Sequence, residues 1–157
     1  MSADRALAAL EAAGLHHRVV RHGPVRSLAE AAAARGVERA AVVKTLVVRR
    51  GDDDFLFVLV PGDRTISWPK LRTLLGVSRL SMPDAATAMD VTGYERGTIT
   101  PFGSTRRWPV VADVRMTGEV TLGAGEHDVA VAVAAADVIA ALGASVADVT
   151  EPDAPSR

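Results

Sequence analysis

Hydrophobic and polar residues alternate along this chain in short blocks, which predict many small helices and strands rather than a few long ones. Blocks with helical spacing are rich in alanine, and most of them are followed by a glycine, which is typical of a helix end because glycine adopts the left-handed conformation easily. The predicted helices are 2–13, 28–35, a stretch of about eight residues after Ser67, 83–89 and 134–142.

Runs rich in valine and aromatic residues predict strands between these helices. The turn Gly51–Asp54 separates two such runs and has the charged composition of an exposed hairpin turn. The segment Ser27–Glu30 has a capping-box pattern, in which the serine oxygen accepts from the backbone N–H three residues on. The predicted strands are 15–21, 42–50, 55–61, 77–81, 110–114, 119–122, 129–133 and 146–149.

This order of elements predicts an α+β fold with a mixed, curled sheet and short flanking helices, because strands do not alternate with long helices as in a doubly wound sheet. A chain of 157 residues is long enough to bury a core without disulfides or a metal. We expect one domain over residues 1–150 and a flexible tail over 151–157, which contains Pro152 and Pro155.

Composition excludes several classes of site and partner. The chain has no cysteine, which excludes disulfides, thiolate metal sites and cysteine nucleophiles. Its formal charge of −1 argues against a protein that coats nucleic acid along its length, so DNA is not an expected partner. Neither a targeting segment nor an apolar stretch long enough to span a membrane is visible, so we expect a cytoplasmic protein without a membrane partner.

Lys44 is the most unusual single residue, because it interrupts the apolar run Ala41–Val48. Period-two spacing predicts that it shares a strand face with Val42 and Leu46. Lysine is rarely buried unless it is paired or functional. Two interpretations remain open: an edge position from which the ammonium reaches water, or a cation in a cavity wall that binds a phosphate, a carboxylate or a polarised carbonyl.

The segment Thr92–Gly103 is predicted to be a loop, since it holds three glycines and a proline and has no usable period. It is either an ordinary surface loop or a binding loop whose backbone N–H groups hold an anion or a developing oxyanion. The four histidines show no metal-ligand spacing, and Ser104-Thr105 is not in a nucleophile elbow, so we predict neither a metal site nor a serine nucleophile.

Lys44-Thr45-Leu46-Val47 on a strand, followed by Thr92-Gly93-Tyr94 and then Gly97-x-x-x-Pro101-x-Gly103, resembles the YbaK/prolyl-tRNA-editing family of free-standing aminoacyl-tRNA deacylases. Arg106-Arg107-x-Pro109 leading into Asp113 belongs to the same pattern, and the resemblance extends over residues 27–149. It implies a mixed sheet curled into a partial barrel. It also implies hydrolysis of the ester between a wrong amino acid and the terminal adenosine of a tRNA, often tRNA-Pro, without a cofactor.

The resemblance also implies roles for particular residues. Lys44 corresponds to the family's invariant lysine and would hold the acyl-adenosine end, while backbone N–H groups around Gly97 would bind the ester carbonyl or position a water. The expected partner is the acceptor end of an aminoacyl-tRNA, and whether a tRNA synthetase also binds is left open. The expected catalytic residues are Lys44 and Gly97, and the expected substrate-binding residues are Ser27, Thr45, Thr98, Ile99, Thr100, Pro101, Phe102, Gly103 and Asp128.

The chain departs from the Cys-tRNA-Pro deacylases of this family at the expected pocket. Ser27 replaces an aromatic residue, and the family's acidic residue falls on Ala130, with Asp128 two residues earlier on the same strand face. Alanine, serine or another small amino acid is therefore as reasonable a substrate as cysteine. A non-catalytic module that binds aminoacyl ends with the same pocket is the alternative to an enzyme.

Overall fold

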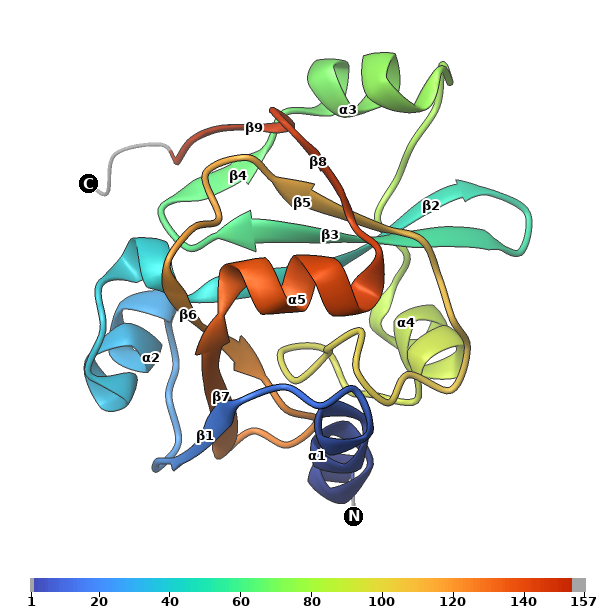
Figure 1. The fold of residues 1–157 in the computed structure, drawn as a ribbon. Coiled ribbons are helices and arrows are strands. Elements are labelled where there is room, and N and C mark those ends of the chain that lie inside the picture. Colours follow the sequence, from blue (N-terminus) through green and yellow to red (C-terminus); the bar gives the residue numbers. More distant parts are fainter. Residues whose placement is uncertain (1, 154–157) are drawn as a thin grey trace.

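A computed structural model describes residues 2–153, in which short helices and strands alternate along the chain (Figure 1). The helices are α1 (Ser2–Ala12), α2 (Leu28–Arg35), α3 (Trp68–Leu75), α4 (Ala85–Thr92) and α5 (Ala135–Leu142), with a 3₁₀ turn at Arg39–Ala41. The strands are β1 (His17–Arg21), β2 (Val43–Gly51), β3 (Asp54–Pro61), β4 (Arg64–Ile66), β5 (Val110–Asp113), β6 (Glu119–Gly123), β7 (Val129–Ala134), β8 (Ser145–Ala147) and β9 (Thr150–Pro152).

The strands form three sheets with the orders β1-β7-β6, β2-β3-β5-β8 and β4-β9. The second sheet is mixed, because β2 and β3 are antiparallel whereas β3-β5 and β5-β8 are parallel. One parallel bridge between Val42 and Thr121 joins the first sheet to the second. The prediction of a mixed α+β fold is confirmed. The curled surface is made of separate sheets that meet at β2 and β6, and the described strands do not close into a barrel.

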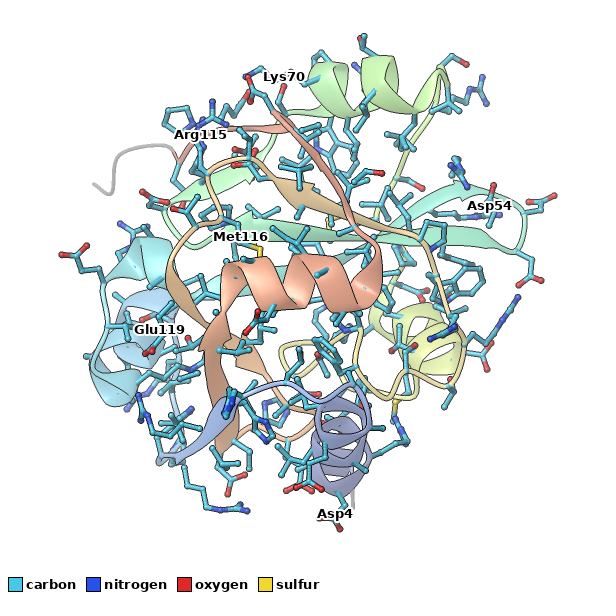
Figure 2. All side chains as sticks on the ribbon, viewed as in Figure 1. Asp4, Asp54, Lys70, Arg115, Met116 and Glu119 are labelled. Atoms are coloured by element: carbon cyan, nitrogen blue, oxygen red, sulfur yellow. The ribbon has the colours of Figure 1, made fainter. Side chains whose placement is uncertain are left out.

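Strand β3 lies inside the second sheet, and seven of its eight residues are buried. Burial on both faces explains its unbroken hydrophobic run, in contrast to the alternation of a half-exposed strand. One face packs in the larger core with α1, α4, α5 and the first sheet, and the other packs in a smaller core with Ile66 and Leu71 (Figure 1). The predicted turn between β2 and β3 projects outward at the side marked by Asp54 (Figure 2).

Helix ends follow the predicted chemistry closely. The Ser27 hydroxyl oxygen accepts from the Glu30 N–H at 3.1 Å, and α2 ends at Gly36 with φ 72°. Ser67 caps α3 in the same way, and Asp84 caps α4 by accepting from the Thr87 N–H at 2.8 Å. The last of these caps moves the fourth helix to Ala85–Thr92, two to three residues later than its predicted range.

The predictions for two strands and for the C-terminal tail need correction. Residues 77–81 do not form a strand, since only Ser81 pairs, in an isolated bridge with Arg49. Strand β4 was not predicted. The expected flexible tail is wrong for Glu151 and Pro152, because both belong to β9 and pair with β4; residues 154–157 lie outside the described part of the chain.

The glycine-rich segment is a loop, as predicted, but it is not an ordinary surface loop. Much of it is buried, including Thr98, Thr100 and Phe102. The Tyr94 hydroxyl donates to the Phe102 carbonyl at 2.7 Å and closes the loop on itself. Among the described residues, no helix combines the length and hydrophobicity that a membrane crossing requires.

Candidate functional site

A cavity of about 670 Å³ opens between α2, β2, the glycine-rich loop and the β6–β7 turn. Its floor is apolar and buried, with Val43 and Val47 from β2 facing Ile99 from the loop and Val129 from β7. Exposed residues surround its mouth: Arg26, Ser27, Met82, Arg96, Gly97 and His127. A volume between about 300 and 1,000 Å³ with a few polar groups on apolar walls is typical of a small-molecule site.

Lys44 is part of the cavity lining and lies on β2, the edge strand of its sheet. Its ammonium donates to the Arg64 carbonyl at 2.5 Å, which uses one of its three N–H groups. Burial lowers the pKa of this lysine, and the negative charge of Asp153 partly opposes that shift. Lys44 thus lies on an edge strand and is part of the cavity lining, while its ammonium is bonded to Arg64, which lies outside the lining.

Thr45 lines the same cavity with a buried hydroxyl that has no hydrogen-bond partner among the described residues. A buried polar atom without a partner carries a free-energy cost, so such an atom in a cavity wall suits a polar ligand. Ser27 also lines the cavity, although its hydroxyl oxygen is engaged in the cap of α2. The two predicted residues, one at the start of α2 and one on β2, thus line the same cavity.

The glycine-rich loop contributes Arg96, Gly97 and Ile99 to the lining, 52 or more residues after Lys44 in the chain. Gly97 has φ 90°, a conformation that favours glycine. The Thr98 N–H is already bonded to the Glu95 carbonyl at 3.0 Å, whereas the backbone N–H groups of Arg96, Gly97 and Ile99 bond no described residue.

Six of the predicted substrate-binding residues do not line the cavity. The Thr100 hydroxyl accepts from the Phe102 N–H at 3.3 Å, and Gly103 accepts from the Arg5 guanidinium at 2.6 Å, so these residues hold the loop against α1. Asp128 is exposed. The residues outside the lining are Thr98, Thr100, Pro101, Phe102, Gly103 and Asp128, and Ser104 and Thr105 are outside it too.

The cavity lining is strongly basic. Arg26, Arg35, Lys44 and Arg96 carry positive charge, and Glu126 is the acidic residue in the lining. One Glu126 oxygen accepts from the Ala3 N–H at 3.2 Å. The chain as a whole has a charge of −1, so the excess of positive charge in the lining is a local feature. Such a field favours an anionic ligand.

A histidine–carboxylate pair lies at the mouth. His127 Nε2 is 3.0 Å from a Glu95 carboxylate oxygen, and the His127 ring is close to Gly97. An imidazole can accept or donate a proton, so this pair adds acid–base capacity beside the loop. The residues described here contain no group of three or more His, Cys, Asp or Glu side chains that could hold a metal ion.

Sequence reasoning missed Arg35, Glu126 and His127 as cavity residues. Arg35 is the last residue of an alanine-rich helix, where a basic residue is ordinary. His127 lies in a turn and has no spacing that marks a site. Nothing in the local pattern of these residues could have placed them at a common cavity.

Residues 22–141 match the family model of the aminoacyl-tRNA editing domain. This chain belongs to that family. The matched range contains every residue of the cavity lining, so the basic pocket is a feature of the editing domain itself.

Relatives of this editing domain agree with the family assignment. The chain is 31% identical over 105 residues to a proline–tRNA ligase of Trichlorobacter lovleyi, which covers 66% of this chain but 18% of that protein. The editing domain therefore spans less than a fifth of this curated relative.

Solved structures match the editing domain over nearly its full length. A candidate trans-editing enzyme for prolyl-tRNA synthetase superimposes with a TM-score of 0.88 at 30% identity, covering 96% of this chain and 97% of the other. The hypothetical protein APE2540 gives a TM-score of 0.85 at 29% identity, covering 94% and 99%. The α+β architecture is thus that of YbaK-like editing proteins.

Proposed function

We propose that this protein is a trans-acting aminoacyl-tRNA deacylase, which hydrolyses the ester of a misacylated tRNA in the cytoplasm. The single observation that carries the proposal is that Lys44, Thr45 and Gly97 line one basic cavity, although the loop follows the lysine strand by about 50 residues. Packing accounts for Gly103, which is enclosed by Tyr94 and Arg5, but not for the exposed Gly97 in the lining.

The proposed substrate end is the acylated terminal adenosine. Lys44 keeps two N–H groups beyond its bond to Arg64, and these can hold the phosphate or ribose of the acyl-adenosine end. The unpartnered Thr45 hydroxyl offers a further hydrogen bond to a polar group of the ligand. Exposed Arg26 and Arg96 at the mouth are suited to the RNA backbone outside the cavity.

The proposed reaction is direct attack by water on the ester carbonyl. A bond forms between the water oxygen and the carbonyl carbon, the bond to the ribose oxygen breaks, and the water proton passes to that oxygen. Backbone N–H groups of Gly97 and Ile99 would stabilise the negative oxygen of the tetrahedral intermediate, and one such donor typically lowers the barrier by about 3 kcal/mol. No protein nucleophile takes part, which suits a lining whose one serine, Ser27, caps α2 and whose histidine, His127, pairs with Glu95.

The substrate we propose is tRNA-Pro, or a related tRNA, that carries a small amino acid. The names of the similar proteins support a prolyl system, since they are a proline–tRNA ligase and a candidate trans-editing enzyme for prolyl-tRNA synthetase. A synthetase that delivers the mischarged tRNA is a further proposed partner. The small Ser27 at the mouth leaves alanine, serine and cysteine as acyl groups to test.

A non-catalytic module that binds aminoacyl ends is the second candidate, and one observation favours it. Ala130, the position of the family's acidic residue, is buried within β7, and Asp128 does not reach the cavity. Tight binding of aminoacyl-tRNA without release of the amino acid would support this candidate over the enzyme.

The test is release of labelled alanine, serine or cysteine from mischarged tRNA-Pro by wild type and by Lys44→Ala. We expect turnover by the wild type and a loss of about 100-fold in the variant, because the acyl-adenosine end loses the charged group that positions it. Lys70→Ala is the matched control, because Lys70 lies outside the cavity lining and bonds Asp148 instead. Equal turnover by wild type and Lys44→Ala, or none on any of the three substrates, would contradict the deacylase proposal.

A further inference from the structure

Arg35 is a half-buried cation without a carboxylate partner among the described residues. It lines the cavity from the last position of α2, and its Nη1 donates to the neutral hydroxyl of Thr121 at 3.1 Å. Its Nε is fully buried and has no hydrogen-bond partner among residues 2–153. Burial lowers the pKa of Arg35, and no nearby charge opposes that shift. In the described part of the chain, no negative charge therefore compensates the guanidinium.

The geometry of the guanidinium shows which side is free. Nη1 is occupied by Thr121, whereas Nε and Nη2, which form the lateral edge of the group, bond no described residue. That edge offers two parallel N–H groups, the arrangement that binds two oxygens of one carboxylate or phosphate. A single hydroxyl or carbonyl oxygen would leave part of the edge and all of the charge unmatched.

We propose that the lateral edge of Arg35 forms an oxyanion subsite in the cavity wall, which binds a ligand group with two terminal oxygens. The inference rests on the proposed function and deepens it. In an aminoacyl-tRNA, such a group is the phosphodiester that precedes the terminal adenosine. A carboxylate on the acyl side chain has the same chemistry and is the second source to be distinguished.

With this subsite, the basic residues of the cavity would bind different parts of the ligand. Arg35 is held in place by Thr121 and by its helix, so it can fix the position of an anion inside the cavity. Arg26 and Arg96 are exposed at the mouth and are suited to looser contacts. The subsite would therefore set how deeply the RNA end enters.

Binding of small, non-hydrolysable probes to the full chain tests the subsite. The first probe is adenosine with alanine joined to its 3′ position through an amide, and the second is the same nucleoside extended by a 5′ cytidylyl phosphodiester. We expect wild type to bind the dinucleotide about 10- to 100-fold more tightly, and Arg35→Gln to lose that preference while keeping its affinity for the nucleoside. Arg79→Gln, a change of an exposed arginine outside the lining, is the matched control.

A third probe, the nucleoside with aspartate in place of alanine, distinguishes the two sources. Suppose that Arg35→Gln removes the tighter binding of the aspartate probe relative to the alanine probe but keeps the tighter binding of the dinucleotide. The subsite is then supported, with a carboxylate of the acyl group as its ligand. If Arg35→Gln does not fold, Arg35→Lys takes its place in the test, since it keeps the charge but loses the paired N–H groups. We expect the ratio of dinucleotide to nucleoside affinity to fall at least fivefold in Arg35→Lys.

Two outcomes would overturn the inference, and they differ in what they say about the function. If the wild type deacylates tRNA but Arg35→Gln changes neither the dinucleotide preference nor the aspartate preference, the subsite is rejected and the deacylase proposal is unaffected. A wild-type protein that neither binds any probe nor releases any amino acid rejects both.

Discussion

At the scale of single residues, Gly97 and Gly103 of the same loop have different surroundings. Gly97 lines the cavity with φ 90°, and a Cβ added there would lie 3.7 Å from the His127 ring, an ordinary contact. Gly103 has φ 75°, and a Cβ there would meet the Tyr94 hydroxyl at 2.6 Å and the Arg5 carbonyl at 2.7 Å. The first position is open toward a ligand, and the second is enclosed by packing.

We therefore predict that Gly97→Ala and Gly103→Ala affect different properties. Gly97→Ala should cost about 1–2 kcal/mol of stability through its backbone alone and should lower deacylation or ligand affinity, because the methyl group enters the cavity mouth. Gly103→Ala should cost about 3 kcal/mol or more, since overpacking adds to the strain. Denaturant unfolding and deacylation rates check the pair, and equal stability losses with equal activities would contradict this separation.

At the scale of elements, one cluster of charges fastens the segment between β8 and β9 to its neighbours. Asp148, between β8 and β9, accepts from Arg115 at 2.8 Å and from Lys70 at 3.0 Å, and the latter two side chains converge at one end of the molecule (Figure 2). Buried Asp113 accepts from the Val149 N–H at 3.1 Å. These bonds hold the short strand β9 beside β4.

This cluster predicts a loss of stability in acid. Hydrogen bonds from Arg115 and Lys70 lower the pKa of Asp148 from 3.8 to about 2. Because the folded-state pKa is depressed, the stabilisation is fully present above about pH 4 and is lost as the pH falls toward 2. Asp148→Asn should thus narrow the difference in unfolding free energy between pH 6 and pH 2.5.

Guanidinium unfolding curves at the two pH values measure that difference. Asp128→Asn is the control, since its carboxyl is exposed and makes no ion pair with a described residue. If the free energy of unfolding falls as much between pH 6 and pH 2.5 in Asp148→Asn as in the wild type, this cluster does not cause the loss of stability in acid.

At the scale of the whole molecule, net charge and local charge differ. The chain carries −1, yet four basic residues and one acidic residue line the cavity. A surface of this kind suits contact with a few phosphates at one RNA end, in contrast to a long basic face that follows a duplex.

We predict that a minihelix consisting of the acceptor stem alone is deacylated about as well as full-length tRNA. Contacts to about three phosphates of a single-stranded end give a slope near −2 in a plot of log affinity against log salt concentration. Filter binding between 50 and 300 mM salt measures the slope. A far steeper slope, or a large preference for the full tRNA, would indicate a more extensive RNA surface.

Local patterns along the chain were sufficient for the elements whose signals are local. Caps at Ser27 and Ser67, glycine ends at Gly36 and Gly76, and the hairpin turn after β2 were predicted because each depends on interactions within a few residues. The motif residues Lys44 and Gly97 were also visible, since a lysine in an apolar strand and a glycine-rich loop are anomalies in the sequence.

Only the tertiary structure decided the rest, because it depends on which distant segments meet. Strands β4 and β9 have three residues each and exist through their mutual pairing, in which Thr65 lies opposite Glu151, 86 residues later. Arg35 looks like an ordinary helix end until α2 packs beside β6, where its guanidinium meets Thr121. The sequence thus determined the helices, the hairpin and the motif, whereas packing decided which of its charges share a cavity.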